Sequence, residues 1–371
     1  MKLSCLQENL TRGLATVSRA VSTKTTLPIT QHILLRTEGT KLKLTATNLE
    51  MTTSCWIGAK VDQEGAVTIP AKLLSAFIDS LPNDQIDLEL SGHKLDFKCL
   101  RFEAKISGMD ASDFPPTPKV SGGITTKVEP KAFREAISQV LLAAAADEPR
   151  PVLTAICCEF DGDKLTMASA DGFRLAVATT TLLDPVVKST LLVPARALNE
   201  VNRLSAEQEK PIEIVSNQQN TQVLFCLQNI EIVSQLIQGA FPDYSKLIPS
   251  KYTTHATVDV SELLRAVKMS AIFARDASNI IRLVVTPGMP GKMVIEARAE
   301  ELGSNKGVVD LVVDGEPTKI AFNARYLIDI LGAMCTPKMT IEISNPSSPG
   351  VFRPVGGHDY IHVLMPMFVQ W

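Results

Sequence analysis

The stretch IPAKLLSAFIDSL at residues 69–81 decides the fold, because the chain carries the same pattern three times. The other two copies are VPARALNEVNRL at residues 193–204 and FNARYLIDILGAM at residues 322–334. Each copy has a small residue, then lysine or arginine, then apolar residues at the spacing of a helix. Copies of one pattern at near-constant intervals predict copies of one structural unit.

Other features recur at nearly the same intervals. The alanines of the helix pattern are separated by 124 and then 129 residues. The strand positions Leu42, Leu165 and Met293 are separated by 123 and then 128 residues. The apolar stripe Leu10, Leu14 and Val17, at i, i+4 and i+7, matches Phe133, Ile137 and Val140, and then Leu263, Val267 and Ser270, where serine takes the last position. The chain is therefore predicted to be a triplicated unit of about 124 residues.

Each unit is expected to begin with an amphipathic helix, to continue with alternating strands, and to end with a second helix and further strands. Strands outnumber helices, and hairpin-like turns such as Asp161-Gly162-Asp163 join neighbouring strands. The predicted fold class is α+β with mainly antiparallel sheet. Proline, glycine and serine cluster at residues 114–123 and 249–251. The predicted domains are residues 1–120, 126–249 and 253–371.

The composition is that of an ordinary soluble protein of 371 residues, with 45% hydrophobic and 21% charged residues. No apolar run is long enough for a membrane span, and the seven cysteines form no CxxC pair, so a reducing cytoplasm is expected. The net charge of −3 argues against a protein that holds nucleic acid by neutralising many phosphates. Support for DNA binding must therefore come from another feature.

A search for catalytic chemistry finds little. His358 and His362 have a spacing that could hold a metal, but their stretch alternates like a strand, where solvated histidines are the simpler interpretation. Cys157 and Cys158 are adjacent in an apolar strand, which favours buried thiols of raised pKa over redox chemistry. Three equal units without a shared reactive residue predict architecture rather than catalysis, with no cofactor and no metal.

Six short motifs follow one another in order along the triplicated frame. They are Thr26-Leu27-Pro28-Ile29, Asn48-Leu49-Glu50-Met51, Ala170-Asp171-Gly172-Phe173-Arg174-Leu175-Ala176, Gly239-Ala240-Phe241-Pro242-Asp243-Tyr244, Phe322-Asn323 and Met365-Pro366-Met367. With these motifs the sequence resembles the bacterial DNA sliding clamps, the β subunits of DNA polymerase III. One such motif is weak evidence, whereas six in register from Met1 to the C-terminus form a strong signal.

The resemblance implies three similar clamp domains per chain and a homodimer of two chains joined head to tail as a closed ring. Helices would line the inside and antiparallel sheets the outside, with double-stranded DNA encircled regardless of its sequence. A ring retains DNA by topology and needs few phosphate contacts, which removes the objection from net charge. The further implied partners are the DNA polymerase III catalytic subunit, the clamp loader, and other polymerases and repair proteins with linear peptide motifs.

Five basic residues are expected to face the DNA. Lys72, Arg196 and Arg325 are equivalent in the three copies of the helix pattern, so on a symmetric ring they should share one orientation. Lys24 matches a basic DNA-contacting loop position of the family, and Arg150 lies in a corresponding loop of the second unit. The alternative for each residue is an ordinary solvated charge.

The resemblance also implies a groove between the second and third units, in which partners dock a short peptide with a glutamine and spaced leucine or phenylalanine residues. Methionine and proline would give an adaptable apolar surface, with Arg174 and Asn323 as polar anchors. Phe173 stands where many relatives have histidine. The implied groove residues are Leu153, Ala170, Gly172, Phe173, Arg174, Leu175, Pro242, Lys246, Leu247, Asn323, Tyr326, Val363, Leu364, Met365, Pro366 and Met367.

For the contact between chains, the resemblance implies Ile272 and Phe273 at one edge, against Phe102 and Ala104 on a strand of the first unit. The expected function is that of a non-catalytic, cytoplasmic processivity factor. Two alternatives remain open at this stage. One is a hydrolase whose triplicated scaffold carries a single degenerate site, and the other is a triplicated protein-binding scaffold without DNA encirclement.

Overall fold

The computed structural model describes residues 1–22, 27–146, 149–275, 278–299, 303–356 and 359–369. By its contacts the chain forms two compact units. The first contains Met1–Pro130 and Glu200–Leu236, and the second contains Lys131–Asn199 and Ile237–Trp371. Each unit therefore combines one outer repeat of the sequence with part of the middle repeat.

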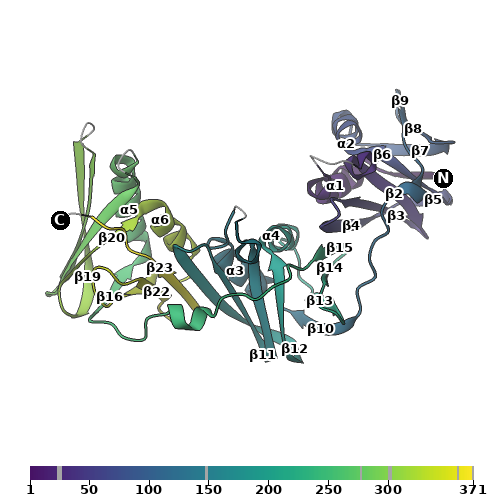
Figure 1. The fold of residues 1–371 in the computed structure, drawn as a ribbon. Helices are drawn as coiled ribbons and strands as arrows, with labels where there is room; N and C mark the ends of the chain where they lie inside the picture. Colours follow the sequence, from purple (N-terminus) through teal and green to yellow (C-terminus); the bar gives the residue numbers. More distant parts are fainter. Residues whose placement is uncertain (23–26, 147–148, 276–277, 300–302, 357–358, 370–371) are drawn as a thin grey trace. The chain divides into compact units, whose positions relative to one another are not determined.

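The first repeat has the predicted helix, strands, second helix and closing strands, but it begins with a strand, β1, that the sequence analysis did not predict (Figure 1). Its elements are β1 (Lys2–Leu6), α1 (Gln7–Val17), β2 (His32–Glu38), β3 (Lys41–Thr47), β4 (Met51–Gly58), β5 (Lys60–Gln63), β6 (Ala66–Pro70), α2 (Ala71–Ser80), β7 (Gln85–Ser91), β8 (Lys94–Cys99) and β9 (Phe102–Ser107).

The third repeat has the same order. Its elements are β16 (Thr254–Asp259), α5 (Val260–Ala274), β17 (Ile280–Thr286), β18 (Gly291–Ala299), β19 (Gly303–Gly315), β20 (Thr318–Asn323), α6 (Ala324–Ala333), β21 (Lys338–Ile343), β22 (Gly350–Pro354) and β23 (Tyr360–Leu364). The registered strand pairs of both outer repeats are antiparallel, so the predicted α+β class is confirmed.

In the middle repeat, two long strands replace the five that separate α1 from α2. They pair from Ala155 opposite Pro194 to Ala170 opposite Leu175, with irregularities around Gly162. The elements of this repeat are β10 (Gly122–Val128), α3 (Pro130–Leu141), β11 (Ala155–Ala170), β12 (Arg174–Pro194), α4 (Ala195–Leu204), β13 (Ile212–Asn217), β14 (Gln222–Leu227) and β15 (Ile230–Gln235).

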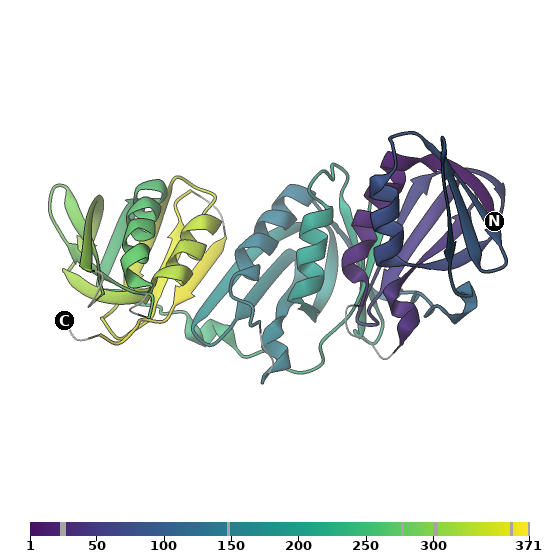
Figure 2. The same cartoon turned by 90° about the horizontal axis from the view of Figure 1, so that it is seen from above.

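The helices form where the apolar stripe predicted them, and they bury that stripe. Leu10, Leu14 and Val17 of α1 are at most 1% exposed. The equivalent residues of α3 and α5 are buried as well. The Asp259 carboxylate caps the start of α5 by accepting hydrogen bonds from the backbone N–H groups of Ser261 and Glu262 at 2.9 and 3.0 Å. Figure 2 shows α1 beside α2 and α5 beside α6, each pair against strands of its own repeat.

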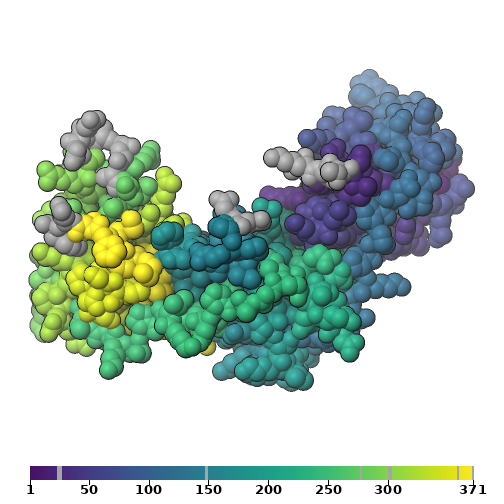
Figure 3. Space-filling view, in the orientation of Figure 1, coloured from purple at the N-terminus to yellow at the C-terminus, as the bar shows by residue number. Residues whose placement is uncertain are grey.

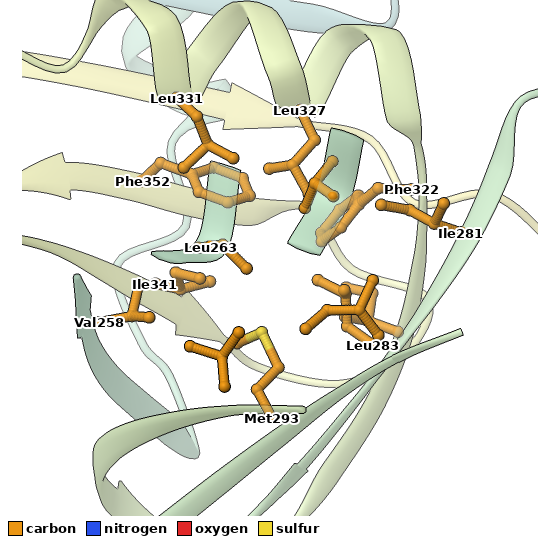
Figure 4. Packing of buried hydrophobic residues seen from close by; sticks show 14 of the residues in the cluster. Val258, Leu263, Ile281, Leu283, Met293, Phe322, Leu327, Leu331, Ile341 and Phe352 are labelled. Atoms are coloured by element: carbon orange, nitrogen blue, oxygen red, sulfur yellow. The ribbon is translucent and has the colours of Figure 1, made fainter. Parts of the chain in front are cut away.

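The core of the third repeat shows how helices and strands are held together (Figure 4). Leu263 of α5 and Leu327 of α6 pack with Met293, Phe322 and other apolar side chains of the strands, and these four named residues have 0% exposure. The Phe322 and Phe352 rings pack edge to face at 5.7 Å. Burying a leucine or phenylalanine side chain contributes about 1.5–3 kcal/mol, so this cluster dominates the stability of the repeat.

Sheets continue from one repeat into the next. In the first unit β15 of the middle repeat pairs with β4 of the first, with Ile232 opposite Thr53. In the second unit β23 of the third repeat pairs with β12 of the middle repeat, with His362 opposite Ala176. In both places the last strand of one repeat pairs with the second strand of a hairpin in the preceding repeat, β4 of the hairpin β3–β4 or β12 of the hairpin β11–β12. We call these two places the internal junctions.

Burial on both faces of the sheet decides two predictions about polar residues. His362 was expected to be solvated, which is wrong: its side chain is 0% exposed, and its Nδ1 lies 2.9 Å from the Tyr360 hydroxyl. His358 lies outside the described residues. Cys157 and Cys158 are buried as predicted, and burial raises the pKa of the Cys157 thiol to about 12.

Candidate functional site

An apolar cluster covers one face of the junction between β12 and β23. Its buried members include Ala170, Leu175 and Val363, with exposures of 9, 3 and 4%. Partly buried side chains pack around them from the chain that follows β15 and from the segment before β11, namely Val152, Ile237, Phe241, Tyr244 and Ile248. We call this set the junction cluster. It lies within the second unit and gathers several of the residues predicted to form the peptide groove.

Large apolar side chains near this cluster are open to solvent. Phe173, Leu247 and Met365 are 58, 51 and 44% exposed. The backbone N–H of Met365 donates to the Phe173 carbonyl oxygen at 2.9 Å, which fixes the C-terminal segment against the turn between β11 and β12. Figure 3 shows that segment in yellow against the teal surface of the middle repeat. Apolar side chains that gather at an exposed surface mark sites where a partner binds.

Arg174 is the polar centre of this region, with a side chain only 11% exposed. Its guanidinium donates to Asp171 at 3.0 Å and to Asp329 at 2.8 Å, and it stacks on the Tyr326 ring at 4.2 Å. Two carboxylates and one aromatic face compensate the buried charge. The predicted polar anchor is therefore held in place by the protein itself.

Asn323, the second predicted anchor, caps α6. Its side-chain oxygen accepts the backbone N–H of Arg325 at 3.0 Å. Met367, half-buried, donates its backbone N–H to the Ala321 carbonyl at 2.8 Å, and Pro366 is buried. Leu364 has 0% exposure and belongs to the core of the third repeat, since neighbouring strand residues face opposite sides. Its side chain does not join the junction cluster.

The remaining predicted groove residues frame the cluster. Leu153 is buried, whereas Pro242 and Lys246 are exposed, and Lys246 pairs with Asp243 at 2.9 Å. Gly172 has a φ of +92°, and a Cβ there would lie 3.3 Å from the Arg150 guanidinium. The turn therefore favours glycine on both counts.

Sequence reasoning missed Asp329 and Tyr244. Asp329 lies three positions after Tyr326 on α6, and this helical spacing was the signal that could have placed it beside Arg174. The Tyr244 hydroxyl donates to Glu159 at 2.6 Å, and burial with this bond raises the pKa of the phenol. Tyr244 was quoted as part of a motif, but its packing depends on contact with a strand 85 residues earlier.

The basic residues of the helix pattern are exposed. Lys72, Arg196 and Arg325 are each the second residue of their helix, and none forms an ion pair within the part of the chain that the structure describes. Arg150 is exposed too. By contrast, Arg203 of α4 is paired with Glu200 at 2.7 Å. Lys24 lies outside the described residues.

The residues predicted for the contact between chains lie on one edge strand, β9, and one helix, α5. Phe102 at the start of β9 is 46% exposed and Ala104 is half-buried. Ile272 of α5 is 62% exposed, whereas Phe273 packs partly buried against the core of the third repeat. Ile272 is thus the member of that pair that presents an apolar side chain to solvent.

Among the described residues there is no cluster of three or more histidine, cysteine or acidic side chains that could hold a metal ion. In the same part of the chain, no helix has the length and apolar character that crossing a membrane requires.

Family descriptions match the chain in three consecutive stretches. The DNA polymerase III beta subunit N-terminal domain matches residues 1–118, the central domain 127–243 and the C-terminal domain 245–368. The beta sliding clamp of Synechococcus elongatus is 32% identical over 372 residues, with 99% of each chain covered. That of Staphylococcus aureus is 28% identical, with 94% of each chain covered.

Solved structures agree over the full length. The DNA polymerase sliding clamp from Bacillus subtilis superimposes with a TM-score of 0.95 at 22% identity, which bears on the fold alone. The DNA polymerase III subunit beta from Pseudomonas aeruginosa has a TM-score of 0.92 at 28% identity. Both comparisons cover 100% of each chain.

Proposed function

The chain belongs to the family of DNA polymerase III beta subunits, the beta sliding clamps, and on that premise we propose that two copies close head to tail into a ring around duplex DNA. As a family member it is a processivity factor of DNA polymerase III and a non-catalytic accessory subunit. Three properties need a residue-level account: ring closure, retention on DNA, and capture of partners.

The two internal junctions are the observation that carries ring closure. Each joins the last strand of one repeat to the second strand of a hairpin in the preceding repeat. A chain with three repeats uses this kind of pairing twice and keeps one unused last strand, β9, at the end of its sheet. In the part of the chain that the structure describes, the first half of β19 pairs with β18 and has no registered partner on its other side. Pairing them between two copies closes a ring and removes both exposed edges, which would otherwise favour aggregation.

Retention on DNA then depends on closure. When a protein neutralises Z phosphates, the logarithm of its binding constant falls with the logarithm of the salt concentration at a slope of about −0.9Z. Numerous tight phosphate contacts would also hinder sliding. A net charge of −3 with a few exposed cations fits a loose electrostatic guide. Lys72, Arg196 and Arg325 at the helix starts, together with Arg150 and Lys24, are the proposed DNA-facing residues.

The junction cluster and the exposed side chains beside it form the proposed docking site for linear peptides. A peptide with spaced leucine or phenylalanine side chains could cover Phe173, Leu247 and Met365, while Arg174 stays fixed by its two carboxylates. The clients would be the polymerase catalytic subunit, the clamp loader, and other polymerases and repair proteins. We propose that the protein binds these partners in the cytoplasm, because its seven cysteines are all free thiols, as is usual in a reducing compartment.

Retention on closed and open DNA tests the function. The protein is loaded by a clamp loader onto nicked circular plasmid, separated from free protein by gel filtration, and followed after a single-site restriction cut. We expect stable retention on the circle and loss within minutes from the linear form. Equal retention on both forms would favour the alternative of a protein-binding scaffold that does not encircle DNA.

A further inference from the structure

After the last strand of each repeat, the chain binds the same strand position of that repeat. In each case a backbone N–H donates to a backbone carbonyl at 2.8–3.0 Å. The donors and acceptors are Met109 and Thr68, Ile237 and Leu192, and Met367 and Ala321. Each acceptor lies three residues before the alanine that begins the second helix of its repeat. The three bonds are therefore equivalent, and we call each of them an edge contact.

In the first two repeats an aromatic residue soon follows the edge contact and covers the neighbouring strand. Phe114, five residues after the first donor, is 6% exposed and packs with Leu34. Phe241, four residues after the second donor, packs against the cluster that contains Cys157. Leu34 and Cys157 are the residues opposite the acceptors of the two edge contacts. The aromatic ring thus lies on an apolar surface beside the strand that accepts the bond.

The third repeat has the same spacing at the end of the chain. Trp371 follows the third donor, Met367, by four residues. Gln370 and Trp371 lie outside the described residues, so Val369 is the last residue whose side chain is placed. Phe368 is 87% exposed, whereas Val369 is half-buried. Alternate residues of an extended segment face the same side, and Trp371 is therefore expected on the side of Val369.

Val369 borders a pocket of about 410 Å³ on the strands β17, β18 and β19. Among the described residues, its basic lining side chains are Arg282, Arg298 and Lys306, and its acidic one is Glu296. Lys306 pairs with Glu296 at 3.5 Å. The described lining therefore has an excess of two positive charges, and we call it the basic pocket.

Arg282 occupies the position that Leu34 and Cys157 occupy in the other repeats. It lies opposite Ala321, the acceptor of the third edge contact. A basic residue thus replaces the apolar residue that the aromatic ring covers elsewhere. This exchange suits an aromatic residue that ends the chain, because arginine can stack on an indole and can also pair with a carboxylate.

We propose that the basic pocket binds the chain's own C-terminus, with the Trp371 indole over Arg282 and the terminal carboxylate paired with Arg298. Two residues of extended chain span at most about 7 Å, so a terminus that begins at Val369 can reach either side of the pocket. Arg298 is exposed and lies two positions after Glu296 on β18, on the same face.

A bound C-terminus also fixes the segment that carries Met365 and Met367, and this consequence rests on the proposed function. The segment is already bonded at two points, from Met365 to Phe173 and from Met367 to Ala321. The basic pocket adds a third attachment directly after them. A peptide that docks against a fixed surface loses less free energy in ordering it, so the attachment should favour peptide binding.

Fluorescence of Trp371 tests the site. The chain has two tryptophans, so Trp56→Phe leaves Trp371 as the single emitter. Acrylamide should quench the folded protein at least about three-fold less efficiently than the urea-unfolded chain, and Arg298→Glu should remove at least about half of this protection. Lys292→Glu is the matched control, because Lys292 lies on the same strand and face outside the pocket. A folded Trp371 as accessible as in urea, or equal losses in both variants, would overturn the proposal.

Carboxypeptidase A provides a second measurement that leaves Trp56 in place. It should release Trp371 at least about ten-fold faster from Arg298→Glu than from the wild type or Lys292→Glu, since cleavage follows the population of the unbound terminus. Equal release from all three proteins contradicts the proposal.

A third measurement separates the site from its effect on docking. Removing Gln370 and Trp371 should raise the Kd of a labelled client peptide about three-fold in fluorescence anisotropy. An unchanged Kd, together with a protected Trp371, refutes the effect on docking while the site stands. A wild-type protein that binds no such peptide refutes the proposed docking function and not the site.

Discussion

Arg174 of β12 and Asp329 of α6 are joined by a hydrogen bond of 2.8 Å although 155 residues separate them in the chain. The bond connects the middle repeat to the third repeat. It also holds the guanidinium over the Tyr326 ring, at the edge of the junction cluster. Arg174 thus stabilises the junction and shapes the surface on which a peptide would dock.

Asp329→Ala is expected to lower the free energy of unfolding by about 1–2 kcal/mol. The reason is that the nearly buried guanidinium loses one of its two carboxylates, while the exposure of Asp329, at 42%, moderates the loss. Urea unfolding followed by circular dichroism measures the change. Asp329→Asn, which keeps an acceptor oxygen, should lose less than half as much. Equal losses for both variants would show that charge alone, and not the bond, matters.

Met365→Ala combined with Met367→Ala is expected to weaken peptide binding at least ten-fold. Each truncation removes apolar contact area worth about 1 kcal/mol from the proposed docking site. Fluorescence anisotropy with a labelled peptide containing a glutamine and spaced leucine and phenylalanine residues measures the affinity. The dimer mass should stay unchanged. Met289→Ala is the control, because Met289 is fully exposed in a loop of another part of the chain. Unaltered affinity in the double variant would place the docking site elsewhere.

Neutralising Lys72, Arg196 and Arg325, the basic residues at the starts of α2, α4 and α6, should slow loading onto DNA without releasing the loaded protein. With Lys72→Gln, Arg196→Gln and Arg325→Gln together, the loaded protein should remain on circular DNA at low salt, because the closed ring holds it. The rate of loading should fall, and its dependence on salt should weaken by up to about three phosphate equivalents. Stopped-flow loading assays at several salt concentrations measure this. Lys188→Gln, at an exposed strand position, is the control. Rapid loss of the triple variant from the circle would mean that contacts, not topology, retain the protein.

The free energy of unfolding should decrease as the pH is lowered from about 6.5 toward 3, because His362 is buried in its neutral form. Burial, with a smaller contribution from the Arg174 charge, lowers the pKa of His362 to about 3 in the folded state. In the unfolded chain the pKa is about 6.5, so the unfolded state binds the extra proton between these values. Stability from neutral His362 is complete above pH 6.5 and decreases below it, by at most about 1.4 kcal/mol per pH unit.

Urea midpoints at pH 7.5 and 5.5 check the direction for His362. The wild type should lose more stability between these two values than His362→Gln, which has no titrating imidazole. Since other groups titrate in both proteins, the difference between the two losses is the informative quantity. A loss of the same size in both proteins would show that the buried imidazole does not govern this window.

The sequence alone determined the triplication, the α+β class and the buried helix stripes at Leu10, Leu14 and Val17. These features follow from periodicity and spacing, which can be read from the sequence without knowing which distant residues are in contact. The motif set determined the family for the same reason: six short matches in order do not depend on how the strands pair.

Only the tertiary structure decided which strands join across repeats and which side of a strand each polar residue meets. Val363 faces the junction cluster while Leu364 enters the core, and His362 is buried because its strand is covered on both faces. The pairing of β12 with β23 brings the middle and third repeats together, so that Arg174 can donate a hydrogen bond to Asp329. Pairings over more than a hundred residues leave no periodic signal in the sequence, since their geometry is set by the packing of whole repeats.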